Sequence, residues 1–153
     1  MTSLAPSSTD VVVRVSGFVK RYKHHLAVDG LDFTVNRGEI YGLIGPDGAG
    51  KSTVMKAIAG VLGYEGGSAE VFGIVVDSER AAEQVKRRIG FLPQGLGLNL
   101  YPELSVEENI DFFARLRLVS EADLRERKAR LFAITRLERF RTRLMKQLSG
   151  GMK

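Results

Sequence analysis

The sequence has no cysteine and only two histidines, His24 and His25. Without cysteine the chain forms no disulfide bond and no thiolate metal site, which fits a reducing compartment. The two histidines are adjacent, so their side chains point apart, and we interpret them as loop residues rather than as metal ligands.

Long apolar runs are also missing, and the longest ones are far too short to cross a bilayer. The first ten residues, MTSLAPSSTD, lack the basic start and the apolar stretch of a signal peptide. We therefore expect residues 1–10 to form a flexible tail. We also expect the chain to be cytoplasmic, with any membrane contact peripheral.

The composition is that of a globular protein. The chain has 153 residues, of which 44% are hydrophobic and 27% charged, enough for one domain with a real core. Its formal net charge of +5 is mildly basic. This charge fits an anionic ligand, nucleic acid or a lipid surface as a partner.

The first part of the chain alternates strand and helix patterns. β-Branched or alternating residues predict strands over residues 11–19, 31–36, 69–76 (a strand or a hairpin arm) and 89–92. Residues 39–44, EIYGLI, are almost entirely apolar, as expected for a central strand covered on both faces. Helical patterns follow over residues 51–62 and 78–88.

The second part, after a boundary near Pro93, is helical. Residues 105–118 open with Ser105 and Glu108 at the spacing of a capping box, in which each side chain binds the other's backbone N–H. Residues 120–134 repeat this device less well with Ser120 and Asp123. We interpret Phe112, Phe113 and Phe132 as core residues of this part.

A glycine-rich segment, GPDGAGKST, connects the apolar strand to the first helix. The phosphate-loop pattern G-x-x-x-x-G-K-[ST] is matched by Gly45, Pro46, Asp47, Gly48, Ala49, Gly50, Lys51, Ser52 and Thr53. The glycines let backbone N–H groups surround phosphates, and the helix adds its positive end. Lys51 can reach the β- and γ-phosphates, Ser52 offers a hydroxyl to Mg²⁺, and Thr53 lies within reach of the α-phosphate. The alternative is a glycine-rich turn that binds nothing.

Together with Gln94 and the closing LSGGMK, this loop resembles the nucleotide-binding domain of ATP-binding-cassette (ABC) proteins. The stretches KRYKHHLAVDGLDF, GEIYGLIGPDGAGKST, IGFLPQ, LYPELSVEENIDFFARL and LSGGMK stand in the family's order. The resemblance implies an α/β fold: a P-loop NTPase (ABC ATPase) core with an antiparallel β subdomain and an α-helical subdomain, truncated after the signature motif. Bacterial exporters, including multidrug-efflux types, are the most similar members.

The family implies a role for each matching residue, with ATP and Mg²⁺ as cofactors. Tyr22 stands where an aromatic side chain stacks on adenine, although an ordinary tyrosine at a strand end is the alternative. Gln94 matches the glutamine that contacts Mg²⁺ or the attacking water, so Lys51 and Gln94 are the expected catalytic residues. The signature residues Ser149, Gly150 and Gly151 would act in trans, on the γ-phosphate held by a second, head-to-tail domain.

Some features of the family are absent or altered. The acidic strand with the Mg²⁺-holding aspartate and the catalytic glutamate, and the switch histidine, would follow Lys153. We therefore expect an N-terminal piece that is marginally stable, at best able to bind ATP, and exposed around residues 39–44. Asp47 stands in place of the usual asparagine and would weaken triphosphate binding. Met152 replaces a glutamine and cannot make its polar contacts.

The helical part is rich in basic residues: Arg125, Arg127, Lys128, Arg130, Arg136, Arg139, Arg141 and Arg143. One interpretation is a solvated face with interspersed acidic residues. Another is a surface toward anionic lipid headgroups or a membrane subunit. Nucleic acid is not expected as a partner, because no aromatic side chains interleave the arginines.

The sequence thus predicts the ATP-binding subunit or domain of an ABC transporter, coupling ATP binding and hydrolysis to export. It would pair with a second nucleotide-binding domain and a transmembrane permease, on the inner face of the membrane. Two alternatives are a soluble ABC-type ATPase acting on ribosomes or nucleic acid, and a non-hydrolysing ATP-binding fragment. The expected domains are a tail (1–10), an ATP-binding core with the β subdomain (11–92), the glutamine loop with the helical subdomain (93–148) and the start of the signature helix (149–153).

Overall fold

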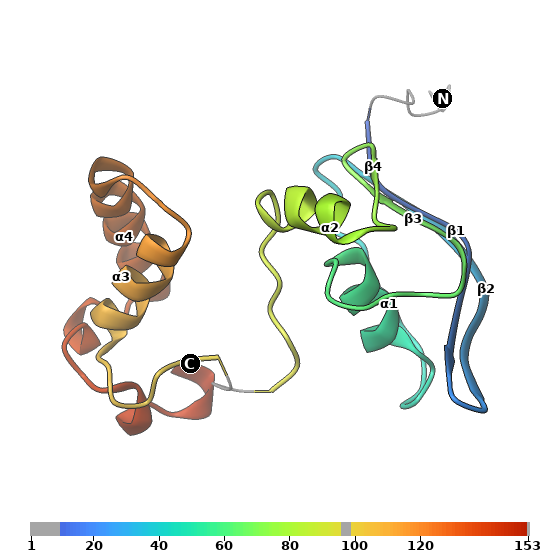
Figure 1. Ribbon diagram of the computed structural model, residues 1–153. Coiled ribbons are helices and arrows are strands. Elements are labelled where there is room, and N and C mark those ends of the chain that lie inside the picture. The colour runs from blue at the N-terminus through green and yellow to red at the C-terminus, as the bar shows by residue number, and fades with distance from the viewer. Residues whose placement is uncertain (1–9, 96–98, 153) are drawn as a thin grey trace, which may run out of the picture. The chain divides into compact units, whose positions relative to one another are not determined.

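The computed structural model describes residues 10–95 and 99–152. It forms two compact units that divide between Leu92 and Pro93 (Figure 1). Residues 1–9, which make up most of the predicted tail, and Lys153 lie outside the described residues. Asp10 is described, and its carbonyl oxygen accepts a hydrogen bond of 2.7 Å from the backbone N–H of Arg37.

The first unit contains an antiparallel sheet with the strand order β2-β1-β3-β4. Its strands are β1 (Val11–Tyr22), β2 (His25–Asn36), β3 (Gly66–Val71) and β4 (Ile74–Val75). The strands predicted over residues 11–19 and 31–36 are confirmed, and residues 69–76 form a hairpin. The predicted antiparallel β subdomain is therefore present.

Tight turns connect neighbouring strands. Lys23 and His24 form the two-residue turn between β1 and β2, and Lys23 has a φ of 51°. The predicted loop position is correct for His24, whereas His25 is the first residue of β2. Phe72 and Gly73 join β3 to β4 with φ values of 53° and 79°. Positive φ at both positions matches the type I′ turn, whose twist suits a hairpin.

Two helices, α1 (Lys51–Ile58) and α2 (Glu79–Lys86), lie on the same side of this sheet (Figure 1). The core that α1 completes consists of Val15, Phe18, Val28, Val54, Ala57 and Ala69. The core that α2 completes consists of Val71, Val76, Ala82 and Val85. Burial of these apolar side chains fixes the start of α1, and hence the glycine loop, against β1 and β2.

Residues 39–44 do not form the predicted central strand. Within the described residues no strand pairs with them, and Ile40 and Ile44 are 100% and 93% exposed. A strand depends on hydrogen bonds to a neighbour, and a parallel central strand also needs cover on both faces. The exposure expected for this segment is confirmed.

The prediction of a short strand over residues 89–92 is also wrong. This segment has no regular secondary structure in the described chain, and Leu92 is 90% exposed. Its apolar composition suits a buried strand, but it is not part of the described sheet β2-β1-β3-β4.

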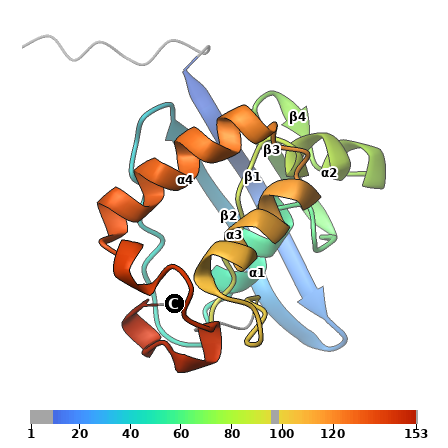
Figure 2. The ribbon, with the colours of Figure 1, turned by 90° about the vertical axis from the view of Figure 1, so that its left-hand side faces the viewer.

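The second unit is helical, as predicted. It contains α3 (Val106–Leu116) and α4 (Glu121–Thr135), which lie side by side (Figures 1 and 2). Single 3₁₀ turns follow at η1 (Glu138–Phe140), η2 (Met145–Gln147) and η3 (Gly150–Met152). The core of the unit consists of Val106, Phe132, Met145 and Leu148, with Met152 packed against it.

The start of α3 has the predicted capping box. The Ser105 hydroxyl accepts from the Glu108 N–H at 3.2 Å, and the Glu108 carboxylate accepts from the Ser105 N–H at 2.7 Å. At α4 only half of the device exists, in which the Ser120 hydroxyl accepts from the Asp123 N–H at 3.2 Å. The core prediction is correct for Phe132, but Phe112 is 37% exposed and does not belong to this core cluster.

Asn109 ties the segment before α3 to the helix. Its side chain is almost fully buried and accepts a hydrogen bond of 2.8 Å from the N–H of Tyr101. The same amide donates to the carbonyl oxygens of Tyr101, Leu104 and Ser105 at 3.0, 3.3 and 3.0 Å. A buried amide with such partners holds residues 101–105 in one conformation.

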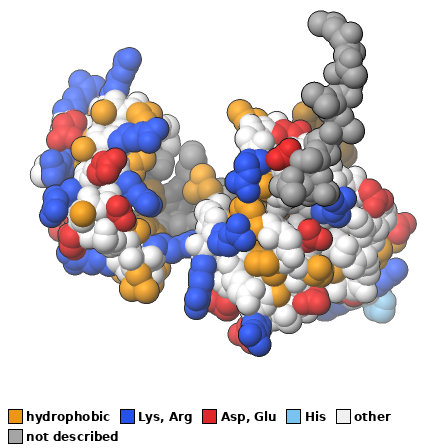
Figure 3. Space-filling view, turned by 90° about the horizontal axis from the view of Figure 1, so that it is seen from above, with side chains coloured by type: hydrophobic (Ala, Val, Ile, Leu, Met, Phe, Trp, Pro, Cys, Tyr) orange, Lys and Arg blue, Asp and Glu red, His pale blue; other side chains and the backbone are white. Residues whose placement is uncertain are grey.

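Some basic residues of this unit form ion pairs with acidic residues of the same unit. Arg141 donates two hydrogen bonds of 2.6 Å to Glu107, and Lys128 bridges Glu107 and Asp111 at 2.7 and 2.6 Å. Hydrogen bonds from Arg141 and then Lys128 lower the pKa of Glu107 to about 2. Burial alone would lower the pKa of Lys128, but its hydrogen bonds to Asp111 and Glu107 raise it. Basic and acidic side chains are interspersed over this unit, at the left of Figure 3, as a solvated face requires.

Candidate phosphate-binding site

The glycine loop, residues 45–53, leads directly into α1. Gly48 and Gly50 both have φ of 84°, in the left-handed region that L-residues with side chains rarely adopt. The N–H of Ala49 donates to the carbonyl oxygen of Pro46 at 3.2 Å, which closes a turn, and the carbonyl oxygen of Gly50 accepts the first helical bond, 3.0 Å from Val54. The backbone thus curls at the start of the helix.

Gly50 is also pressed against β2. A β-carbon at this position would lie 2.5 Å from Cγ2 of Val28 and 2.6 Å from the carbonyl oxygen of Ala27. The loop therefore needs glycine at position 50 for space as well as for φ. Val28 itself belongs to the core that α1 completes, so the sheet sets how closely the loop approaches it.

Lys51 reaches back across the loop. Its ammonium group donates hydrogen bonds of 2.7 Å to the carbonyl oxygen of Gly45 and 2.6 Å to that of Pro46. The positive charge is therefore held at the loop by two neutral acceptors. Neutral carbonyls bind a cation less strongly than phosphate oxygens do, so an anion can replace them.

The first turn of α1 carries Lys51, Ser52 and Thr53 and is suited to an anion. Within the described residues no side chain caps this helix, and its first turn contains no acidic residue. The first N–H groups of a helix lack partners within the helix and carry partial positive charge. Ser52 is exposed there. Asp47 is also exposed, in the turn that precedes Gly48.

The structure brings Tyr22 to this loop. Its hydroxyl lies 3.5 Å from Oγ1 of Thr53, and the residue is 43% exposed. The ammonium group of Lys20 lies 5.3 Å from the centre of the Tyr22 ring, within the range of a cation–π contact. Sequence reasoning did not single out Lys20, although its spacing of two residues from Tyr22 on one strand face was the available signal.

The remaining predicted site residues belong to the second unit. Gln94 is exposed and has no regular secondary structure. Ser149 and Gly150 are exposed beside the buried Leu148, and η3 begins at Gly150. The Met152 N–H donates to the carbonyl oxygen of Ser149 at 3.0 Å. Among the predicted site residues, the structure therefore brings Tyr22 into contact with the glycine loop, through Thr53.

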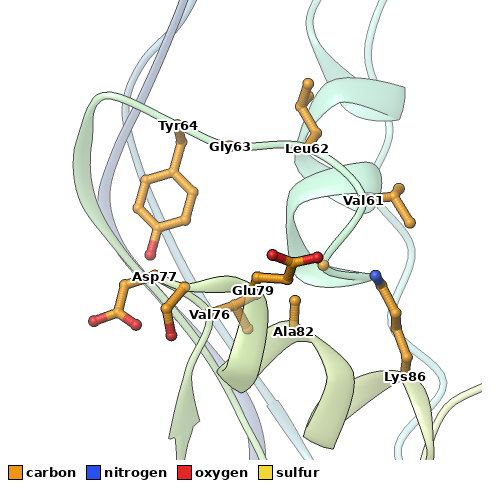
Figure 4. A pocket seen from close by; sticks show the side chains of 11 residues that line it. Val61, Leu62, Gly63, Tyr64, Val76, Asp77, Glu79, Ala82 and Lys86 are labelled. Atoms are coloured by element: carbon orange, nitrogen blue, oxygen red, sulfur yellow. The ribbon is translucent and has the colours of Figure 1, made fainter.

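A separate hollow of about 620 Å³ lies beyond the other end of α1 (Figure 4). Residues 60–64, residues 76–79, Ala82 and Lys86 line it. Figure 4 shows the side chains of Tyr64, Asp77, Glu79 and Lys86 around it. No residue of the glycine loop lines this hollow, so it is not the predicted phosphate site.

Other kinds of site find no support in the described residues. In that part of the chain no group of three or more histidine and acidic side chains could hold a metal ion. Nor does any described helix have the length and apolar character needed to cross a membrane. A glycine loop that leads into the uncapped start of a helix matches the loop and helix of a P-loop, whereas the strand that precedes such a loop is not formed by residues 39–44 here.

Comparison with known proteins gives the family. The profile of the ABC transporter family matches residues 28–153. A probable multidrug ABC transporter ATP-binding protein, YbhF of Escherichia coli (strain K12), is 41% identical over 94% of this chain and 25% of its own length. The daunorubicin/doxorubicin resistance ATP-binding protein DrrA of Streptomyces peucetius is 43% identical over 92% of this chain and 42% of its own length.

Solved structures agree with this result. The structure of an ATP-binding subunit of an ABC transporter matches with a TM-score of 0.80 and 30% identity, over 92% of this chain and 57% of that chain. The cassette MJ0796, a dimer bound to ADP and Pi, matches with a TM-score of 0.76 and 26% identity, over 92% of this chain and 64% of that one. This chain belongs to the ABC transporter family. It spans between a quarter and under half of the length of these curated relatives.

Proposed function

We propose that this chain is the nucleotide-binding part of an ABC exporter ATPase, and that its glycine loop holds the triphosphate of ATP. The position of Lys51 is the observation that carries the proposal. Its ammonium group lies over the loop, on the carbonyl oxygens of Gly45 and Pro46. A triphosphate entering the turn would take this charge from two neutral acceptors and gain the N–H groups at the start of α1.

Mg²⁺ fits the same site. Ser52 is exposed on the first turn of α1 and can offer its hydroxyl to a cation that the triphosphate brings. Gln94 would provide a further oxygen ligand or contact the attacking water. When bound, Mg²⁺ supplies charge neutralisation for the β- and γ-phosphates. Within this chain, Lys51 and Gln94 are the proposed catalytic residues.

Tyr22 would bind the base. Its ring stands beside Thr53, and a half-exposed aromatic face is suited to stacking on adenine. The triphosphate and the base would thus be held by one unit of the chain.

The signature residues would complete the site of a second domain. Ser149 and Gly150 are exposed although Leu148 is buried, so the turn presents a hydroxyl and backbone groups outward. We propose that these groups, with Gly151, contact the γ-phosphate held by the glycine loop of the other domain in a head-to-tail dimer. A solved relative of the family, MJ0796, is a dimer bound to ADP and Pi.

The full-length protein would hydrolyse ATP and drive export with a transmembrane permease, at the cytoplasmic face of the membrane. The support is the function printed for relatives, which include a drug-resistance ATP-binding protein and a Nod factor export ATP-binding protein of Ralstonia nicotianae. We propose that the 153-residue chain by itself would bind ATP without steady turnover.

Mixed dimers test the composite site. In the full-length protein, Lys51→Ala and Ser149→Arg are each expected to abolish ATP hydrolysis. If the signature acts in trans, a dimer with one subunit of each kind keeps one intact site, so mixing the two variants restores part of the activity. Mixtures of either variant with itself are the control. Activity that mixing does not restore would contradict the trans arrangement, and hydrolysis unaffected by Lys51→Ala would contradict the proposed function.

A further inference from the structure

We infer that Glu65 and Lys20 are positioning residues that hold the ring of Tyr22 in place as the platform for the nucleotide base. This inference rests on the proposed function, in which the glycine loop binds the triphosphate. It adds two residues outside that loop, and it assigns them to the base alone.

Glu65 is attached to three consecutive residues of β1. Its N–H donates to the carbonyl oxygen of Val19 at 3.0 Å. Its carboxylate accepts hydrogen bonds of 2.7 Å from the ammonium group of Lys20 and 2.7 Å from the N–H of Arg21. These bonds lower the pKa of Glu65, with the bond from Lys20 as the larger cause. The residue next along the strand is Tyr22.

This attachment lies where the ladder between β1 and β2 is irregular, just before the paired end of β1. The register between β1 and β2 shifts between Phe18 and Lys20, and again between Lys20 and Arg21. Such an irregularity leaves a residue unpaired and locally disrupts the ladder, and regular pairing resumes at Arg21 and Tyr22. The carboxylate of Glu65 binds the N–H of Arg21 next to the second shift, and so adds a contact there from outside the β1–β2 ladder.

Lys20 supports the ring from one side. Its side chain is only 11% exposed, although that of its partner Glu65 is 50% exposed. The ammonium group lies 5.3 Å from the ring centre of Tyr22, and the pair with Glu65 keeps it there. A cation held against one face of the ring leaves the other available for a base.

The hydroxyl end of the Tyr22 ring lies next to the glycine loop. The hydroxyl of Tyr22 lies 3.5 Å from Oγ1 of Thr53, in the first turn of α1. Tyr22 is therefore held through the backbone of the preceding residue Arg21, at one ring face and at its hydroxyl. A side chain that is already ordered loses less conformational entropy when a ligand binds to it.

The alternative is a purely structural pair, in which Glu65 only neutralises a largely buried lysine. Both interpretations predict some loss of stability when the pair is broken. They differ in ligand binding, because only a positioning role separates the base from the phosphates. Inorganic tripolyphosphate provides this separation, since it has three phosphates and no base.

The experiment measures the affinity of the full-length protein for Mg-ATP and for Mg-tripolyphosphate by calorimetry. The variants are Glu65→Ala and Lys20→Met. The matched control is Glu70→Ala, which removes a carboxylate from β3 opposite Arg14, far along the strand from Tyr22. Both variants are expected to weaken Mg-ATP about three- to tenfold, a typical range for one aromatic contact, and to leave Mg-tripolyphosphate unchanged. Glu70→Ala should change neither.

A double-mutant cycle with Tyr22→Ala tests whether Glu65 acts through the ring. If it does, the double variant binds Mg-ATP no more weakly than Tyr22→Ala alone. Additive losses, an unchanged Mg-ATP affinity in Glu65→Ala, or equal losses for both ligands would each overturn the inference. Failure of the proposed function gives a different result, in which Lys51→Ala alters the affinity for neither ligand.

Discussion

The Cα of Gly50 lies so close to Val28 that a β-carbon on it would stand 2.5 Å from Cγ2 of that valine. The glycine loop is therefore seated directly on β2, and Gly50 has a φ of 84°. Gly48 has the same φ of 84°, but a β-carbon there would meet nothing within 4 Å. The two glycines thus separate the cost of a clash from the cost of backbone strain.

We predict that Gly50→Ala destabilises the first unit more than Gly48→Ala does. Strain alone should cost about 1–2 kcal/mol at either position. At Gly50 the clash with Val28 and Ala27 adds to it, so ATP binding should be lost as well. Thermal unfolding and ATP titration of both variants measure the difference. Equal effects of the two substitutions would show that the contact with β2 has no role.

A second prediction concerns Glu107 and Arg141 and the pH dependence of the helical unit. The pKa of Glu107 is lowered from 4.5 to about 2, so its ion pairs stabilise the folded unit above about pH 4.5. This contribution is lost as the pH falls from 4.5 toward 2. At pH 7, Glu107→Gln should reduce the stability of α3 by about 1–2 kcal/mol, since its partners are only partly buried.

Hydrogen exchange of the α3 amides at pH 7 and at low pH measures this effect. The control is Glu103→Gln, which breaks an ion pair of 2.7 Å with Lys146 whose side chains are 72% and 49% exposed. An exposed pair contributes less than about 1 kcal/mol, so the control should change little. If Glu107→Gln were as mild as the control, or its effect were the same at both pH values, the network would not support α3.

Asp47 carries a third prediction. This carboxylate is exposed in the turn before Gly48, where a bound triphosphate would repel it. Asp47→Asn should tighten ATP binding about two- to tenfold, because two like charges separated by a few ångströms near water repel each other by about 1 kcal/mol. Asp77→Asn, at the hollow beyond α1, removes the same charge elsewhere and should have no effect. Equal or weaker affinity in Asp47→Asn would contradict the prediction.

What the sequence predicts well depends on neighbours along the chain. The capping box of Ser105 and Glu108 and the strands over residues 11–19 and 31–36 follow from patterns within a few residues. The conformation of residues 39–44 depends on other strands that must pair with them. Their apolar pattern indicates that both faces need to be covered, but it does not show whether the rest of the chain covers them.

The site divides in the same way. The glycine loop is recognisable because its chemistry is contiguous, and its position before α1 is as predicted. The contacts of Glu65 with Lys20 and of Glu107 with Arg141 join residues 45 and 34 positions apart. No local pattern indicates such pairs, since surface carboxylates and cations are common and only the fold decides which of them meet. The roles of the loop residues, Tyr22, Gln94 and the signature residues remain predictions.

The central claim is that Lys51 grips the triphosphate of ATP in the glycine loop. The most direct measurement is the ATP affinity of the full-length protein, compared between Lys51→Ala and Lys56→Ala, a matched change of an exposed lysine in the same helix. We predict a loss of about a hundredfold for Lys51→Ala, as for removal of a charged partner worth roughly 3 kcal/mol, and no change for Lys56→Ala. Equal ATP affinity in both variants and the unaltered protein would contradict the account.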